Sequence, residues 1–215
     1  MIAGKFITIE GQDGSGKTTN LEYLCTYLEQ QGINIVVTRE PGGTELGEAI
    51  RELLLGNQTL SIADKAELLL IFAARAQHLS SVIQPALAAG KWVVCDRFTD
   101  ATYAYQGAGR AIDYQDIATL EAFVQDGLKP DLTLLLDVDI SIGQQRVQDR
   151  SKQQSQVLDR FEQQQLDFKQ RVRQHYLGLA DNEPDRVKLI NAEQSLADVQ
   201  QSITVTVNNF INKNQ

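Results

Sequence analysis

The sequence predicts an α/β protein with a five-stranded parallel sheet and helices on both faces. Two observations predict this class. Short, almost uninterrupted apolar segments alternate with longer segments of helical period, and a glycine-rich loop separates the first apolar segment from the first helical one. Strands of a parallel sheet covered on both faces have such continuous apolarity. Right-handed crossovers between them would place the helices on both sides of the sheet.

The predicted strands are short and rich in β-branched residues or leucine. They lie at residues 5–10, 33–38, 91–96, 132–137 and 186–191. The segment 20–32 is predicted to be a helix, because Leu21, Leu24 and Leu28 share one face and Gly32 is a stop signal.

A second long helical segment runs over residues 66–90. The glutamine-rich segment 150–165 is polar without being a repeat, which favours a solvated helical hairpin or a mobile segment. Because no long Pro/Gly/Ser linker divides the chain, we expect a single domain over residues 1–215.

The composition and net charge disfavour several classes of protein. The chain has 215 residues, 42% of them hydrophobic, and a net charge of −8 from 28 acidic and 20 basic side chains. This charge disfavours bulk nucleic-acid binding, so phosphate binding must come from locally placed arginines. Cys25 and Cys95 have no metal-ligand spacing, which predicts neither disulfide nor zinc and favours a reducing cytoplasm. Without a signal peptide or an apolar run of about 20 residues, we expect a soluble protein that does not enter membranes.

The glycine-rich loop carries the strongest motif. Gly11, Gly16, Lys17 and Thr18 fill the pattern G-x-x-x-x-G-K-[ST] between a predicted strand and a predicted helix. Lys17 would reach the β- and γ-phosphates of a nucleoside triphosphate, and Thr18 would hold Mg²⁺. The predicted ATP-binding residues are Gly11, Gln12, Asp13, Gly14, Ser15, Gly16, Lys17, Thr18 and Thr19.

Other phosphate-loop proteins are regulatory switches. A guanine-reading N-K-x-D is typical of those, and here the sequence has only NKNQ at residues 212–215. Asp96 ends a predicted strand at the position from which a carboxylate usually reaches the metal or its waters. Arg39, Arg75 and Arg97 could converge at the same sheet edge on a second anionic substrate.

Five motifs extend over most of the chain: EGQDGSGKTT, TREPGGT, FAAR, DRFTDATYAYQG and LDRFE. With them the chain resembles the bacterial thymidylate kinases, a family with the P-loop nucleoside monophosphate kinase fold. The resemblance implies transfer of the γ-phosphate of ATP to thymidine monophosphate, giving the diphosphate, and a homodimer.

The resemblance also implies the substrate-binding residues Asp13, Arg39, Arg75, Arg97, Thr102, Tyr105 and Gln106. Among them, Arg39 and Arg97 would hold the acceptor phosphate, Asp13 would lie near the sugar and the metal, and Tyr105 would pack on the deoxyribose. A carboxylate beside phosphates repels them unless a metal-bound water or a sugar hydroxyl intervenes, which favours a functional role for Asp13.

Arg75 and Gln106 would meet the base. The family usually carries a phenylalanine four residues before that arginine, where this chain has Ile71, with Phe72 next to it. Because one helical residue turns a side chain by about 100°, Phe72 is predicted to pack in the core instead.

No residue at positions 12–15 is positively charged, and family members with such loops supply a further cation from a lid. The candidate lid spans about 141–160. Arg146 and Arg150 are four residues apart and would share one helical face, with Arg160 as the next candidate.

The predicted catalytic residues are Asp13, Lys17, Arg97, Arg146 and Arg150, and the predicted metal ligands are Thr18 and Asp96. The leading hypothesis is an ATP-dependent kinase of thymidine monophosphate. A kinase of another nucleotide or nucleoside is the near alternative, and a nucleotide-binding switch is the distant one.

Overall fold

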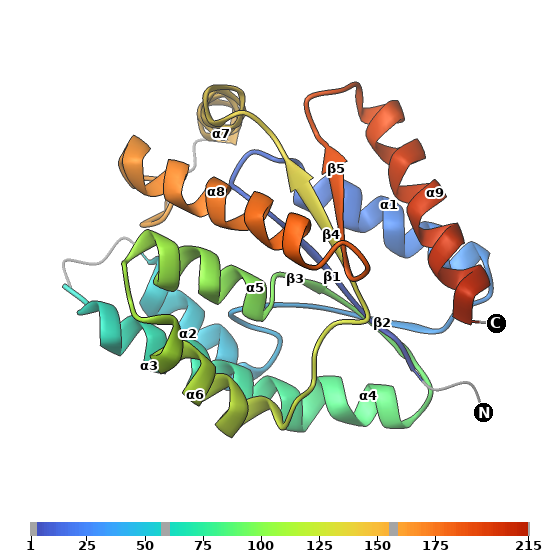
Figure 1. Cartoon of the computed structure of the whole chain (residues 1–215), viewed down its shortest axis with the longest axis horizontal. Helices are drawn as coiled ribbons and strands as arrows, with labels where there is room; N and C mark the ends of the chain where they lie inside the picture. Colours follow the sequence, from blue (N-terminus) through green and yellow to red (C-terminus); the bar gives the residue numbers. More distant parts are fainter. Residues whose placement is uncertain (1–3, 57–60, 155–158, 215) are drawn as a thin grey trace.

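A parallel sheet forms the centre of the molecule (Figure 1). The structure is a computed structural model that describes residues 4–56, 61–154 and 159–214. The strands are β1 (Phe6–Gly11), β2 (Ile35–Arg39), β3 (Trp92–Asp96), β4 (Leu132–Asp137) and β5 (Val187–Asn191). Their order across the sheet is β2-β3-β1-β4-β5, and every pair in it is parallel. The predicted five-stranded parallel sheet is therefore confirmed.

The helices follow the strands as the crossover rule requires. They are α1 (Lys17–Gln30), α2 (Glu45–Leu55), α3 (Asp64–His78), α4 (Gln84–Ala88), α5 (Thr99–Thr102), α6 (Tyr114–Gln125), α7 (Ile140–Gln154), α8 (Leu166–Asn182) and α9 (Leu196–Asn214). Two π-helical segments, Leu79–Ile83 and Tyr103–Gly109, continue α3 and α5. In Figure 1, α1 and α9 cover one face of the sheet, and α4, α5 and α8 lie on the other.

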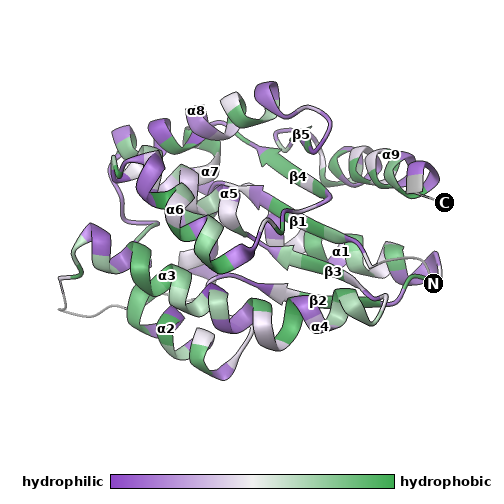
Figure 2. Ribbon diagram, turned by 60° about the horizontal axis from the view of Figure 1, so that its bottom comes forward, coloured by the Kyte–Doolittle hydropathy of each residue, from purple (hydrophilic) through white to green (hydrophobic). Residues whose placement is uncertain are grey.

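Alternate strand residues build the two halves of the core, because successive side chains point to opposite faces. Ile7 and Ile9 of β1 pack with Leu24 and Leu28 of α1, the helical face expected from the sequence. Phe6 lies on the opposite face, in the cluster formed with the α4 side. Figure 2 shows the strands as a largely apolar band between the helices.

One helical stretch among the described residues, Asp64–Ala88, is long and apolar enough to cross a membrane by length and composition alone. Half of its most apolar window is buried inside the molecule. Its buried residues pack on the sheet and on neighbouring helices, as expected for a core helix.

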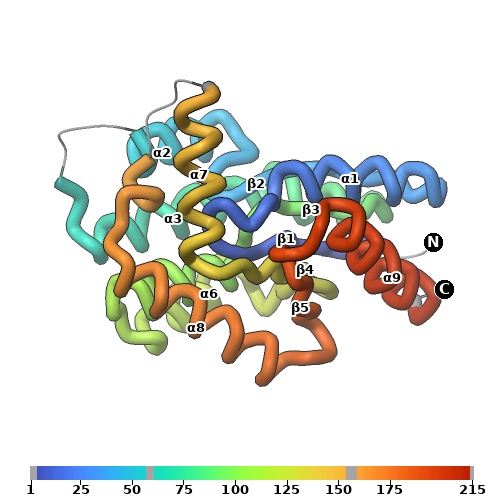
Figure 3. Tube along the Cα trace, turned by 90° about the horizontal axis from the view of Figure 1, so that it is seen from above, coloured from blue at the N-terminus to red at the C-terminus, as the bar shows by residue number. Residues whose placement is uncertain are grey.

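The strand register brings the functional segments together. Arg39 at the end of β2 is aligned with Asp96 of β3, and Ile9 of β1 is aligned with the same Asp96. The loops after these three strands therefore leave one edge of the sheet at the same level, where open α/β sheets bind ligands. Helix α7 crosses beside the loop between β1 and α1 (Figure 3). The candidate lid is helical as far as residue 154, and its residues 155–158 lie outside the described chain.

Replacing Arg186 by methionine should destabilise the fold. Its guanidinium donates to both carboxylate oxygens of Asp100, at 2.7 and 3.0 Å, and joins the start of β5 to α5. Breaking a largely buried ion pair by removing one partner costs about 3 kcal/mol. Urea denaturation should show a loss of this size, whereas the exposed Lys91→Met control should change stability by less than about 0.5 kcal/mol. Equal stabilities for the two variants would contradict the role assigned to this pair.

Candidate active site

The loop between β1 and α1 depends on glycine. Gly11, Gly14 and Gly16 have φ values of 138°, 80° and 86°, a region that side chains disfavour. A Cβ atom on Gly14 would lie 2.2 Å from the backbone oxygen of Gly143 in α7. The glycines thus allow both the turn and a backbone-to-backbone approach of the lid helix.

Lys17 opens α1 beneath this loop. Its Nζ donates to the carbonyl oxygens of Gly11 and Gln12, at 3.0 and 2.9 Å. Burial lowers the pKa of Lys17 to about 8, and the charge of Arg97 acts in the same direction. A polyphosphate bound at the loop would place negative charge beside the ammonium of Lys17 and so favour its charged form.

A cleft of about 880 Å³ runs from the loop along the sheet edge. The predicted site residues that line it are Asp13, Gly14, Gly16, Lys17, Thr18, Thr19, Arg39, Arg75, Asp96, Arg97, Thr102, Tyr105, Gln106, Arg146 and Arg150. Three predicted ATP-binding residues, Gly11, Gln12 and Ser15, are not among its lining residues and are buried.

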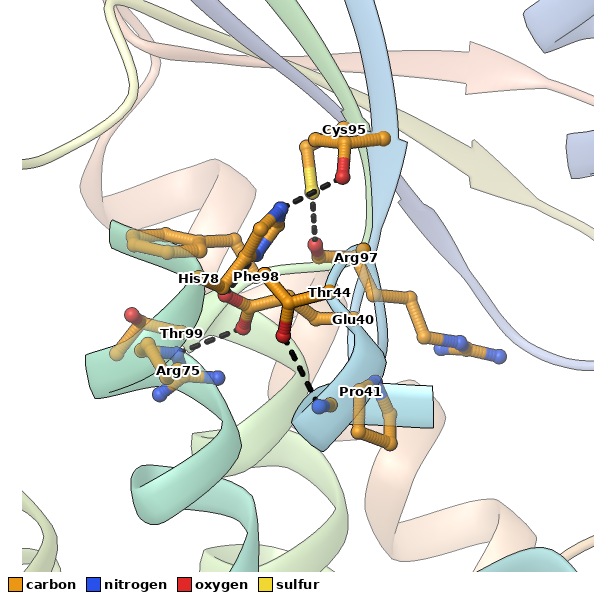
Figure 4. Close-up of polar contacts among 12 residues, drawn as sticks. Glu40, Pro41, Thr44, Arg75, His78, Cys95, Arg97, Phe98 and Thr99 are labelled. Atoms are coloured by element: carbon orange, nitrogen blue, oxygen red, sulfur yellow. Dashed lines mark hydrogen bonds and ion pairs between the residues drawn. The ribbon is translucent and has the colours of Figure 1, made fainter. Parts of the chain in front are cut away.

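Arg97 lines the cleft and contacts the phosphate loop. Its Nη2 is 2.9 Å from Oδ1 of Asp13, and its Cζ is 4.8 Å from the ring centre of Tyr105. Its backbone has a φ of 68°, and its carbonyl accepts a hydrogen bond from Sγ of Cys95 at 3.0 Å (Figure 4). The arginine after β3 therefore connects directly to the phosphate loop.

Glu10 is a buried acid near enough to Arg97 to feel its charge, and it was not predicted as a site residue. Its carboxylate accepts hydrogen bonds from the Phe98 amide and the Tyr176 hydroxyl, both at 2.7 Å. Burial raises its pKa to about 8, with the charge of Asp100 adding to the rise. An acidic residue inside an otherwise apolar strand is the signal that points to such a group.

Arg75 is buried, and most of its guanidinium is in contact with neighbouring side chains. Nε donates to Glu40 at 2.7 Å and Nη2 to Thr102 at 2.9 Å, while Phe72 and Phe98 cover the guanidinium from 4.8 and 4.9 Å. Its Nη1 is buried without a partner among the described residues. A buried donor in this state is available to a ligand.

His78 holds the other oxygen of Glu40. Its Nδ1 is 3.0 Å from Glu40, and its Nε2 is 2.6 Å from the Thr38 hydroxyl. Figure 4 shows Arg75 and His78 both directed at Glu40. No sequence motif surrounds His78, although Arg75 and His78 are three residues apart and hence on one helical face.

The structure shows where Ile71 and Phe72, the departure from the family pattern, lie. Ile71 and Phe98 line the cleft, whereas Phe72 is buried in a cluster with Leu68 and Ile117. Core packing of Phe72 is therefore confirmed. Arg39 lies at the rim, where it pairs with Glu48 at 2.7 Å and half of its side chain is exposed.

The lid arginines have different partners. Arg146 donates to the carbonyl oxygens of Gly14 and Ala192, at 3.3 and 3.0 Å. Arg150 forms an ion pair with Glu162. Arg160 pairs with Glu67 and does not line the cleft.

Thr18 and Asp96 suit a magnesium ion bound together with phosphates. Oδ1 of Asp96 is buried without a partner among the described residues. Within the described ranges, no cluster of three or more His, Cys, Asp or Glu side chains is placed to hold a metal ion. Mg²⁺ usually takes one or two protein oxygens and completes its shell with substrate phosphates and waters, so these residues fit it.

A phosphate loop facing an arginine-lined pocket across one cleft is the arrangement of a P-loop nucleoside monophosphate kinase. A family model described as Thymidylate kinase matches residues 9–203. A thymidylate kinase from Pseudomonas putida is 54% identical over 202 residues, which are 94% of each chain. One from Chromohalobacter salexigens is 55% identical over 204 residues, also 94% of each.

The solved structures give the same family. The crystal structure of thymidylate kinase from Ehrlichia chaffeensis has a TM-score of 0.76 and 36% identity, covering 96% of this chain and 99% of that one. The chain belongs to the thymidylate kinase family, and the resemblance found in its motifs is confirmed.

Glu10→Gln should remove a pH dependence of stability. The folded-state pKa of Glu10 is raised from 4.5 to about 8, so between these values the unfolded chain loses the proton while the folded protein keeps it. The free energy of unfolding of the wild type should therefore contain a contribution that falls as pH rises through this window. Urea denaturation at intervals across the window should show a smaller fall for Glu10→Gln than for the exposed control Glu52→Gln. Parallel curves for the two variants would refute the protonated state of Glu10.

Proposed function

We propose that the two halves of the cleft bind the two substrates of one phosphoryl transfer. The reaction is the ATP-dependent phosphorylation of thymidine monophosphate to the diphosphate, a step toward dTTP. The observation that carries the proposal is the 2.9 Å contact between Asp13 of the phosphate loop and Arg97 of the acceptor side. It supports a donor and an acceptor held close together and in line.

On the donor side, residues 11–19 surround the triphosphate and Lys17 follows its γ-phosphate. Mg²⁺, held by Thr18 and Asp96, would neutralise charge on the phosphates. On the acceptor side, Arg39 and Arg97 bind the monophosphate. Phosphoryl transfer needs little covalent work from a protein, so fixed cations and alignment supply most of the catalysis.

The remaining assignments concern the nucleoside. Tyr105 packs on the deoxyribose, with Asp13 near the sugar, while Arg75, Gln106 and Thr102 line the base side. Arg75 supports this division because its guanidinium is buried between two aromatic rings. Such a site suits a planar base better than a hydrated phosphate.

We also infer that residues 1–215 act as a single domain in the cytoplasm, without nucleic-acid or membrane partners, and that two copies form a homodimer. Phe123 on α6 is 83% exposed in the single chain. An aromatic side chain this exposed supports a dimer interface on that side. Sedimentation analysis of the wild type and Phe123→Asp tests the dimer.

A coupled assay of ADP release tests the function. Rapid release with thymidine monophosphate and negligible release without an acceptor is expected. A preference for another monophosphate in a panel would support the near alternative. Slow, acceptor-independent hydrolysis would support a switch.

Lys17→Ala should lower turnover by more than about a hundredfold, because a preorganised charge that acts on the transferring phosphoryl group is lost. The exposed Lys91→Ala variant is the control and should keep wild-type turnover. Near-normal turnover of a correctly folded Lys17→Ala protein would remove Lys17 from the catalytic set.

Arg146→Ala or Arg150→Ala should lower turnover at least about tenfold, with a smaller effect on the KM of the monophosphate. Steady-state kinetics of both variants and of the exposed control Lys91→Ala would measure this. Full activity in the Arg146/Arg150 double variant would mean that the extra cation comes from elsewhere, with Arg160 next to be tested.

A further inference from the structure

Glu67 on α3 is a fully buried carboxylate whose acceptor sites are all engaged. Gln106 donates its Nε2 to Oε1 at 2.8 Å. Arg110 approaches both carboxylate oxygens, at 3.4 and 3.3 Å, and Arg160 pairs with Oε2. The side chain of Glu67 has no exposed surface. Two guanidinium groups therefore compensate the negative charge of this buried carboxylate.

This charge decides how the amide of Gln106 is oriented. A glutamine amide has an accepting and a donating end, and its last torsion permits either orientation. An ionised carboxylate can only accept, so the NH₂ of Gln106 must face Glu67 and its Oε1 must point away. Gln106 lines the cleft, and no donor to its Oε1 occurs among the described residues.

Arg75 presents a hydrogen-bond donor to the same cleft, in contrast to the acceptor of Gln106. Its Nε and Nη2 are occupied by Glu40 and Thr102, and Nη1 is left as a buried donor. The base side therefore offers one fixed donor from Arg75 and one fixed acceptor from Gln106.

A pyrimidine with a keto group at C4 accepts a hydrogen bond at O4 and donates one at N3. A 4-amino pyrimidine has the reverse pattern at both positions. We propose that Glu67 is the positioning residue that makes the cleft select 4-keto pyrimidines, by holding the amide of Gln106 as an acceptor. This inference rests on the assignment of Arg75 and Gln106 to the base side under the proposed function. Sites that hydrogen-bond a substrate group discriminate strongly, because a mismatched partner leaves buried polar groups unpaired.

Glu67→Gln tests the proposal because it keeps the shape of Glu67 but can donate as well as accept. The amide of Gln106 can then turn over. The ratio of kcat/KM for thymidine monophosphate to that for deoxycytidine monophosphate should fall at least about tenfold, while the KM of ATP stays unchanged. The matched control is Asp64→Asn, the same carboxylate-to-amide change at a half-exposed residue one turn earlier in α3 that pairs with Arg110 and does not contact Gln106, and it should leave the ratio within about twofold.

A second comparison isolates the coupling between the two residues. In a Gln106→Leu background, Glu67→Gln should no longer change the ratio, because the amide on which it acts is gone. Equal losses for both nucleotides in Glu67→Gln, with an unchanged ratio, would reduce Glu67 to a structural residue and overturn the proposal. A wild type that does not prefer thymidine monophosphate over deoxycytidine monophosphate would instead refute the proposed function.

A measurement on the wild type covers the case in which Glu67→Gln does not fold. The side-chain amide protons of Gln106, assigned in NMR spectra by their absence in Gln106→Leu, should exchange more slowly than those of exposed glutamines. Exchange as fast as that of exposed glutamines would show that Glu67 does not hold the amide, and would overturn the proposal.

Discussion

Carboxylates paired with arginines hold the carboxyl edge of the sheet in shape. Asp13 pairs with Arg97 and Glu40 with Arg75, and each pair joins segments that are far apart in the chain. Removing one member of such a pair leaves an uncompensated charge, so the geometry is costly to change. The arginines are thus oriented before a substrate arrives, which is the condition for electrostatic catalysis. It also reconciles an acidic chain with a phosphate-binding cleft, because the cations are local and individually supported.

The sequence was informative wherever local patterns decide the structure. Continuous apolar segments located all five strands to within about two residues. Because the carboxyl ends of parallel strands share an edge, Arg39 and Arg97 could be assigned to one cleft. The burial of Glu67 against Arg160 could not be predicted, since the two residues are 93 apart in the chain and no spacing rule links them. Glu67 shares the first turn of α3 with Asp64 and Lys65, which favours a solvent-facing turn, and only tertiary packing shows that Glu67 is buried.

The lid helix is continuous with the phosphate site. Arg146 donates to backbone carbonyls of both the loop after β1 and the segment after β5, so it connects α7 to both of these segments. Arg150 lies one turn further and is tied to Glu162 instead. Two arginines on one helical face therefore differ in their partners. Arg146 bonds backbone carbonyls, whereas Arg150 is ion-paired with a carboxylate.

The left-handed backbone of Arg97 has a consequence for how this chain can change over evolutionary time. Arginine at a φ of 68° is strained by of order 1 kcal/mol, and glycine would relieve that strain. Yet glycine has no guanidinium. Greater stability therefore favours glycine at this position, whereas retention of the guanidinium requires arginine. Lineages that kept the fold but no longer needed the reaction would be expected to lose the arginine early.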